Sequence, residues 1–256
     1  MRLIVLVKQT LTTEARIALN DSGGIEDAKI KKVVNPYDEF AVEEAVQLRE
    51  KGVAEHVTVV TVGPESAVEA SRHCLAMGAD EAVRIDDSEI ESTDSFSVAE
   101  VLGAALKGME FDLLLAGQVA VDDNASQVAV RVAEILGLPQ INVVSKIELG
   151  GGEVTASREA DGQTEVLTAK LPALVTTDKG INKPRYPTLP NIMKAKKKPL
   201  TIKSLSDLGI AAPTPKVKVV AHTLRPAKQG AKIFAGTPAE AAAQLAEALR
   251  NEAKVI

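Results

Sequence analysis

Short apolar runs alternate with amphipathic segments over the first half of the chain. The runs are nearly continuous in apolar residues and lie at residues 2–7, 56–62, 81–85 and 111–117. Strands that are buried on both faces of a parallel sheet have this pattern. Segments with apolar residues at helical spacing lie between them, at residues 37–52, 65–78 and 98–108, and each ends on a glycine. We therefore expect a doubly wound, mostly parallel α/β sheet with right-handed crossovers.

The pattern changes twice further along the chain. Residues 146–177 contain a glycine turn between alternating strand patterns, which predicts an antiparallel hairpin or meander appended to the sheet. After Leu200 there are few core-sized apolar residues before a helical pattern at residues 237–253. Such a segment can hardly bury itself alone. We expect an α/β domain over residues 1–200 and a C-terminal arm and helix over residues 201–256 that pack on another protein chain.

The stretch RYPTLPNIMKAKKKPL, residues 185–200, fits neither a core strand nor a membrane span. Two prolines remove backbone donors, and the stretch is shorter than the roughly twenty apolar residues that cross a bilayer. Four lysines occupy five positions directly after the apolar cluster. We expect a loop, here called the docking segment (residues 184–199), that presents apolar side chains to a partner.

Composition limits the classes of function. The chain of 256 residues is 45% apolar and carries a net charge of −5, which does not favour a nucleic-acid partner. A single cysteine rules out an internal disulfide and a site of clustered thiolates. No leader-like segment or membrane span is recognisable, so we expect a bacterial cytoplasmic protein that does not insert into a membrane.

Ligands of open α/β sheets bind at the carboxyl ends of the strands, where helix N-termini offer free N–H groups. The loops with this position are VKQT, NPYDE, VGPES and GQVAVDDNASQVA, at residues 7–10, 35–39, 62–66 and 117–129. The last leads into a helix predicted to begin near Gln127, whose N-terminus could hold a phosphate with help from Ser126. Asp122, Asp123 and Asn124 could equally be ordinary capping and turn residues, and the sequence leaves both interpretations open.

Catalytic motifs are absent from the sequence. The three histidines lie in unrelated segments without metal-ligand spacing, and Cys74 lies on an apolar helix face with no activating group nearby. Neither the dinucleotide glycine fingerprint nor a Walker phosphate loop is present. We therefore expect no enzymatic activity and no metal site.

Several segments, in order and spacing, resemble the β subunit of electron-transfer flavoprotein. They are VVNPYDEFAVEEAVQLRE, CLAMGADEAVRID, LLLAGQVAVDDNASQVA, ASREADGQTEVLTAKLPALVT and PRYPTLPNIMKAKKKPL. The resemblance implies an adenine-nucleotide α-hydrolase-like fold and a heterodimer whose α subunit holds most of a redox-active FAD. The β subunit of this family carries a buried AMP, a loop that docks on acyl-CoA dehydrogenase-type flavoenzymes, and a C-terminal region that embraces the α subunit. Electrons pass on towards the respiratory chain, with a membrane quinone oxidoreductase as a further partner.

The resemblance also assigns site residues. The AMP contacts that it implies are Leu6, Val7, Lys8, Asn35, Pro36, Tyr37, Asp38, Val62, Gly63, Gly117, Gln118, Val119, Ala120, Val121, Asp122, Asp123, Asn124, Ala125, Ser126, Gln127 and Val128. The partner contacts that it implies are Arg185, Tyr186, Leu189, Pro190, Ile192, Met193, Lys196, Lys197 and Lys198. Leu189 matches the leucine that anchors the loop in a hydrophobic pocket of the dehydrogenase.

Two alternatives remain open. Electron-bifurcating members of the family bind a second FAD in place of AMP and usually read QAIDGDTAQVGP in the long loop. This chain has Asp123 in place of a glycine and Ala129 and Val130 in place of a GP pair, which favours AMP. An adenine-nucleotide enzyme or sensor domain of related fold is the alternative from another class. The enzyme would need an SGGxDS loop after the first strand, and VKQTLTTE lacks it.

Overall fold

The computed structural model describes residues 1–226 and 230–256, and it divides into two compact units, Met1–His222 and Thr223–Ile256. Residues 227–229 belong to the expected C-terminal arm and lie outside the described residues. None of the helices in the described part of the chain is long and apolar enough to cross a membrane.

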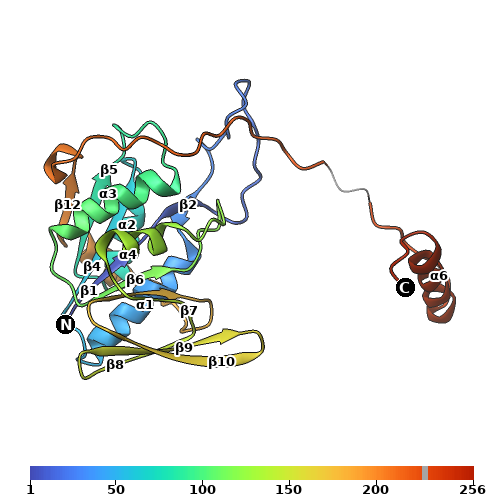
Figure 1. The fold of residues 1–256 in the computed structure, drawn as a ribbon. Helices are drawn as coiled ribbons and strands as arrows, with labels where there is room; N and C mark the ends of the chain where they lie inside the picture. The colour runs from blue at the N-terminus through green and yellow to red at the C-terminus, as the bar shows by residue number, and fades with distance from the viewer. Residues whose placement is uncertain (227–229) are drawn as a thin grey trace. The chain divides into compact units, whose positions relative to one another are not determined.

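A seven-stranded parallel sheet forms the centre of the first unit (Figure 1). Its spatial order is β12 (Leu200–Lys203), β5 (Glu81–Asp86), β4 (His56–Gly63), β1 (Arg2–Leu6), β6 (Leu113–Gly117), β11 (Ala173–Thr177) and β7 (Gln140–Val144). The chain moves from β1 through β4 to β5 on one side and then returns to β6 on the other side of β1. Strand order thus reverses between β1 and β6, which is the position where α/β sheets of this kind bind ligands.

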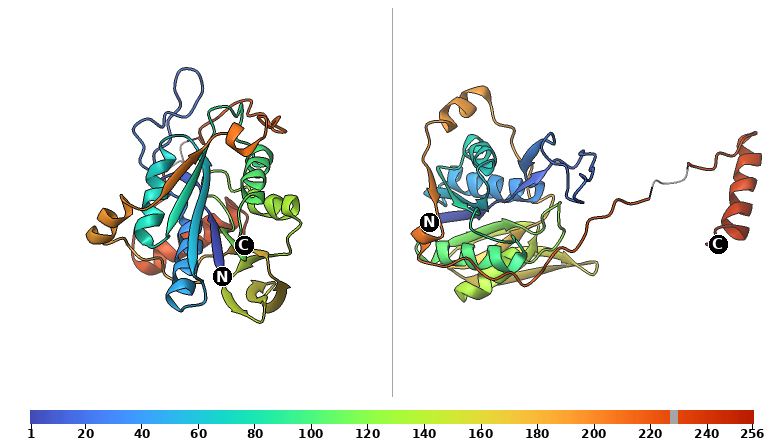
Figure 2. Two further views of the ribbon diagram at one scale, coloured as in Figure 1. Left: turned by 90° about the vertical axis from the view of Figure 1, so that its left-hand side faces the viewer. Right: turned by 90° about the horizontal axis from the view of Figure 1, so that it is seen from above.

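Helices cover both faces of the sheet (Figures 1 and 2). One apolar cluster joins the odd-numbered residues Leu3 and Val5 of β1 to α1 (Pro36–Glu50) and α2 (Ala67–Met77). The other cluster joins Ile4 and Leu6 to α3 (Ser95–Lys107) and α4 (Val128–Leu136). Successive side chains of a strand point to opposite faces, so β1 is buried from both sides. The predicted doubly wound α/β fold is confirmed.

Local sequence signals place the helix ends. The Asp94 side chain caps α3 by accepting a hydrogen bond from the Ser97 amide, at 2.7 Å. Gly78 ends α2 with a positive φ of 147°, and a Cβ atom there would lie 2.7 Å from Val46 Cγ1 of α1. A glycine is therefore required both by the backbone conformation and by the close approach of α1.

The segment expected as a hairpin or meander divides between two sheets. Strands β8 (Lys146–Gly150), β9 (Glu153–Ala160) and β10 (Gln163–Lys170) form a separate antiparallel sheet, which is the meander. The expectation was wrong for residues 173–177, because β11 lies between β6 and β7 in the main parallel sheet. All five residues of β11 are buried, as in a central strand. A short antiparallel pair, β2 (Gln9–Leu11) and β3 (Lys32–Val34), completes the strands.

The docking segment differs from the expected loop. Thr188 caps a short helix, α5 (Leu189–Ala195), by accepting a hydrogen bond from the Asn191 amide, and Pro190 occupies its first turn. The following residues form β12, which pairs in parallel with β5 at the edge of the main sheet. The first unit therefore continues past the boundary expected at residue 200 and ends at His222.

The second unit contains one helix, α6 (Pro238–Asn251), within its described residues. Thr237 and Glu240 form a capping box at its start, and Pro238 occupies the first turn. The helix has no buried residues, and none of the other described residues of this unit is buried. That is what the composition of the segment predicts.

Candidate functional site

A cavity of about 380 Å³ opens at the carboxyl ends of β1, β4 and β6. It is lined by the residues that follow each strand, including Lys8 after β1, Pro64 after β4 and Gln118 after β6. The cavity thus lies at the reversal of strand order between β1 and β6. Its volume falls at the small end of the range of roughly 300–1,000 Å³ that is typical of small-molecule sites.

The structure brings most of the residues assigned to the nucleotide into this cavity. Those that line it are Leu6, Val7, Lys8, Asn35, Asp38, Val62, Gly63, Gly117, Gln118, Val119, Ala120, Asp122, Asp123, Ala125, Ser126, Gln127 and Val128. Pro36, Tyr37, Val121 and Asn124 belong to the same segments but are not among the lining residues. Four loops that are distant in sequence therefore meet at one place, as expected for the carboxyl ends of parallel strands.

Two buried side chains at the start of α1 join the loops around the cavity. Asn35 Nδ2 donates to the Val119 carbonyl at 2.9 Å, and Asn35 Oδ1 accepts from the Val121 amide at 3.2 Å. Asp38 accepts from the Lys8 amide at 2.7 Å and from the Gly117 amide at 3.1 Å. Asn35 precedes the helix without capping it through its side chain. These residues therefore act as cross-links between strand ends rather than as ordinary helix-start residues.

Burial raises the pKa of the Asp38 carboxyl to about 7, although the two amide donors and Lys8 act in the opposite direction. Its side chain is almost fully enclosed, and desolvation disfavours the charged form of an acid. The charge at the base of the cavity therefore changes near neutral pH.

Lys8 extends its ammonium group to the loop after β6. Lys8 Nζ lies 2.8 Å from Asp122 Oδ1 and 2.9 Å from Asp123 Oδ2. Desolvation lowers the pKa of Lys8, but the hydrogen bonds and charges of the two carboxylates outweigh this and raise it. The ammonium group thus fastens the loop after β6 to the end of β1.

The loop after β6 is held in a compact turn by its own hydrogen bonds. Asn124 and Ser126 adopt positive φ values of 53° and 52°, and Asp123 Oδ1 accepts from the Ala125 amide at 2.9 Å. The Asn124 amide donates to the Ala120 carbonyl at 2.9 Å, so both amides are used within the loop. The helix that follows, α4, has no side-chain cap, and Gln127, Val128 and Ala129 at its start line the cavity. Its N-terminal N–H groups are therefore suited to a phosphate or another anion.

The sequence did not identify every lining residue. The additional ones are Gln9, Thr10, Leu11, Asp27, Lys32, Pro64, Ala67, Asp87, Thr93, Ser95, Val98, Leu102, Ala116 and Ala129. Gln9 and Pro64 lie in loops that the sequence had marked, and Gln9 exchanges hydrogen bonds with Ser66 across them, at 2.7 and 2.8 Å. The capping pattern before α3 could have indicated Thr93 and Ser95. No sequence signal marks Asp27 and Lys32.

Cys74 is not among the residues that line the cavity. Cys74 is fully buried in the core, where burial raises the pKa of its thiol, and Asp38 and Glu39 raise it further. Within residues 1–226 and 230–256 no group of three or more histidine, cysteine or acidic side chains could hold a metal ion. The residues that line the cavity carry polar and charged groups that are suited to binding a ligand.

The docking segment presents apolar side chains to solvent. Leu189 is 79% exposed and Tyr186 is 92% exposed, with Ile192 and Met193 also exposed nearby. Lys196 and Lys197 are exposed beside them. Arg185 and Lys198, by contrast, are engaged with groups of the chain itself. Pro190 is exposed and begins α5 with Leu189.

The fold and the cavity define a doubly wound α/β protein with a ligand pocket at the carboxyl ends of its parallel strands. The model of the electron transfer flavoprotein domain matches residues 22–208. The chain is 45% identical, over 259 residues and the full length of both proteins, to the electron transfer flavoprotein subunit beta of Bacillus subtilis. It is 45% identical to the subunit beta of Syntrophomonas wolfei over 255 residues, covering 100% of this chain and 98% of the relative. For the mouse subunit beta the identity is 38% over 250 residues, covering 96% and 97%.

The chain therefore belongs to the electron transfer flavoprotein β-subunit family, and the predicted resemblance is confirmed. This membership makes it an electron-transfer protein of the flavoprotein class.

Proposed function

We propose that this chain is the β subunit of a heterodimeric electron transfer flavoprotein. The α subunit supplies most of the FAD site, and this chain supplies a pocket for a structural AMP. The heterodimer accepts electrons from acyl-CoA dehydrogenase-type flavoenzymes and passes them through a membrane quinone oxidoreductase towards the respiratory chain. It acts as an electron carrier and not as an enzyme in its own right.

The observation that carries the AMP proposal is the cavity at the reversal of strand order. It joins a helix N-terminus suited to a phosphate with an apolar region around Val98 and Leu102 of α3 that suits a nucleobase. Its volume of about 380 Å³ gives room for a mononucleotide. Lys8, Asp122 and Asp123 form ion pairs with one another in the lining of the cavity.

The docking proposal rests on the exposed apolar side chains of the docking segment. Tyr186, Leu189 and Met193 are each more than half exposed and lie within eight residues of one another. Exposed apolar residues in such a cluster commonly mark a protein interaction site. The neighbouring Lys196 and Lys197 add an attraction to acidic partners that acts mainly on the association rate.

The test is a cofactor count on the co-purified heterodimer. Acid extraction followed by chromatography and flavin absorbance should give one FAD and one AMP per heterodimer. Two FAD molecules without AMP would replace the proposal with the electron-bifurcating type. Detectable ATP hydrolysis by this chain alone would favour an adenine-nucleotide enzyme, and reversible nucleotide binding without the α subunit or flavin would favour a sensor domain.

A further inference from the structure

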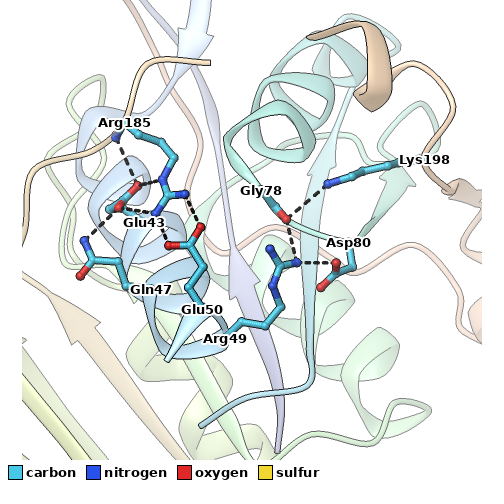
Figure 3. Close-up of polar contacts among 8 residues, drawn as sticks. All are labelled: Glu43, Gln47, Arg49, Glu50, Gly78, Asp80, Arg185 and Lys198. Carbon is cyan, nitrogen blue, oxygen red and sulfur yellow. Dashed lines mark hydrogen bonds and ion pairs between the residues drawn. The ribbon is translucent and has the colours of Figure 1, made fainter. Parts of the chain in front are cut away.

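The N-terminal end of the docking segment is held on α1 by a fork of ion pairs (Figure 3). The Arg185 guanidinium donates to both oxygens of Glu43, with Nε–Oε2 at 2.8 Å and Nη2–Oε1 at 2.9 Å. It also donates to both oxygens of Glu50, with Nη1–Oε1 at 2.6 Å and Nη2–Oε2 at 2.9 Å. The Arg185 amide adds a hydrogen bond to Glu43 at 3.2 Å. One side chain therefore binds two carboxylates in bidentate geometry.

Glu43 makes it energetically unfavourable for Arg185 to break these ion pairs. Its side chain is only 4% exposed, and it also accepts a hydrogen bond from Gln47 Nε2 at 2.9 Å. Burial raises the pKa of Glu43, but the hydrogen bonds from Arg185 and Gln47 outweigh burial and hold the pKa below its ordinary value. If Arg185 turned outward to a partner, Glu43 would remain as a buried charge without its cation, which is strongly unfavourable.

The C-terminal end of the docking segment is held on α2. The Lys198 ammonium donates to the carbonyls of Leu75, Gly78 and Ala79 at 3.0, 3.3 and 2.5 Å, at the end of that helix. Figure 3 shows Lys198 and Arg49 converging on the Gly78 carbonyl. A cation at a helix C-terminus satisfies carbonyls that have no partner within the helix. Arg72 of α2 fixes the same end, because its Nη1 donates to the Ala195 and Lys198 carbonyls, both at 2.7 Å.

The part of the segment between these two ends has little support of its own. Ala195 is the one buried residue of α5. A hollow of about 190 Å³ lies beneath the segment, bordered by Asn191 and Lys194 of the segment and by Leu75 and Met77 of α2. A helix of seven residues is too short to be stable through its own hydrogen bonds. Together with the packing of α5 on α2, the two anchored ends therefore hold the exposed apolar side chains in place.

We propose that Arg185 and Lys198 are positioning residues that fix the two ends of the docking segment on α1 and α2, and that neither contacts the partner protein. This inference rests on the proposed docking function and refines it, because the contact surface is reduced to the exposed side chains of the segment. Fixing the segment before docking lowers the conformational entropy that the complex loses on formation. The position of α5 is thereby determined by side chains that the partner never touches.

The first test is hydrogen–deuterium exchange of the segment in the purified heterodimer, without any partner. The variants are Arg185→Lys, which keeps the charge but loses the bidentate fork, and Lys198→Met, which keeps the length of the side chain without its charge. The amides of residues 189–198 should exchange at least about tenfold faster in both variants, because local opening becomes easier. Lys197→Met is the matched control, since Lys197 is exposed, and its exchange should equal that of the wild type. Unchanged exchange in both Arg185→Lys and Lys198→Met would overturn the inference.

The second test measures association with an acyl-CoA dehydrogenase over a range of ionic strengths. Both positioning variants should bind roughly three- to thirtyfold more weakly, because they lose preorganisation. Arg185→Lys keeps its charge and loses no intermolecular ion pair, so it should also keep the salt dependence of the wild type. Lys197→Met should change the salt dependence instead. A changed salt dependence in Arg185→Lys would mean that this residue contacts the partner and would overturn the inference.

Two outcomes separate the positioning role from its premise. Faster exchange together with unaltered dehydrogenase binding in every variant, Leu189→Ala included, would refute the docking function while showing that the ends are anchored. If Arg185→Lys does not fold, Glu50→Gln replaces it, because Glu50 forms the outer and half-exposed part of the fork. Glu50→Gln should accelerate exchange at residues 189–198 to a smaller extent, and wild-type exchange in this variant would count against the inference.

Discussion

The substitution Gly117→Ala tests the construction of the cavity most directly. A Cβ atom at position 117 would lie 2.6 Å from the Tyr37 carbonyl carbon and 2.7 Å from the Asp38 amide nitrogen, and it would also collide with Asp38 Oδ1. Two of these atoms belong to the backbone of the first turn of α1, so no rotation of a side chain removes the overlap. The end of β6 and the start of α1 must therefore move apart.

The cost of this movement has two parts. Forced overpacking typically costs about 1–3 kcal/mol. The separation also weakens the hydrogen bond from the Gly117 amide to the buried Asp38 carboxyl, and bonds to charged groups contribute about 1.5–3 kcal/mol. Because the structure can relax in part, we expect the free energy of unfolding to fall by about 2–5 kcal/mol. We also expect the co-purified AMP to be lost, since the same atoms define the base of the cavity.

The assay combines urea unfolding of the heterodimer with a count of AMP after acid extraction. Gly103→Ala is the matched control, because its Cβ would lie 2.6 Å from Ile135 Cγ2, a side-chain atom of α4. The overlap there is with a side chain and not with backbone, and the exchange of glycine for alanine within α3 returns up to about 1 kcal/mol of helix propensity. The control should therefore keep its AMP and lose less stability. A Gly117→Ala protein with wild-type stability and a full complement of AMP would refute this reasoning.

Three further predictions concern other parts of the chain. Leu189→Ala should change the free energy of unfolding by no more than about 0.5 kcal/mol, since the side chain is 79% exposed. In a titration it should weaken dehydrogenase binding by about 2–4 kcal/mol, and an affinity equal to that of the wild type would exclude Leu189 as the anchor. Asp38 has a folded-state pKa of about 7, above its unfolded value, so the protonated form stabilises the fold and this stability is lost as pH rises from about 4 to 7. Urea unfolding of the wild type and of Asp38→Asn at several pH values measures this loss. The difference in free energy of unfolding between the two proteins should change by up to about 1.4 kcal/mol per pH unit between pH 5 and 7, and a difference that is independent of pH would contradict the raised pKa of Asp38. Deleting residues 223–256 should leave the first unit folded but weaken its association with the α subunit in analytical ultracentrifugation, and an unchanged dissociation constant would argue against an arm.

The sequence by itself determined the features that depend on local pattern. Strands β1, β4, β5 and β6 could be located because each is buried on both faces and is therefore apolar almost throughout. Because these buried strands alternate with helices, they form a parallel sheet, and the loops that follow the strands meet at one edge of that sheet. The pattern thus placed the loop after β6 and the start of α1 at this edge, and the family resemblance assigned them to one nucleotide site.

Only the tertiary structure decided which segments pair and which charges are buried. Residues 173–177 read like the last strand of a meander, because a strand pattern does not say which neighbour the strand will find. Glu43 lies in a segment that the sequence predicts as an amphipathic helix, and the family resemblance assigned Arg185 to the partner interface. The two form a bidentate pair across 142 positions of sequence, and the fold buries Glu43 almost completely. Hydrophobic periodicity reports the environment of each residue along its own element, whereas the partner of a buried charge depends on how distant elements pack.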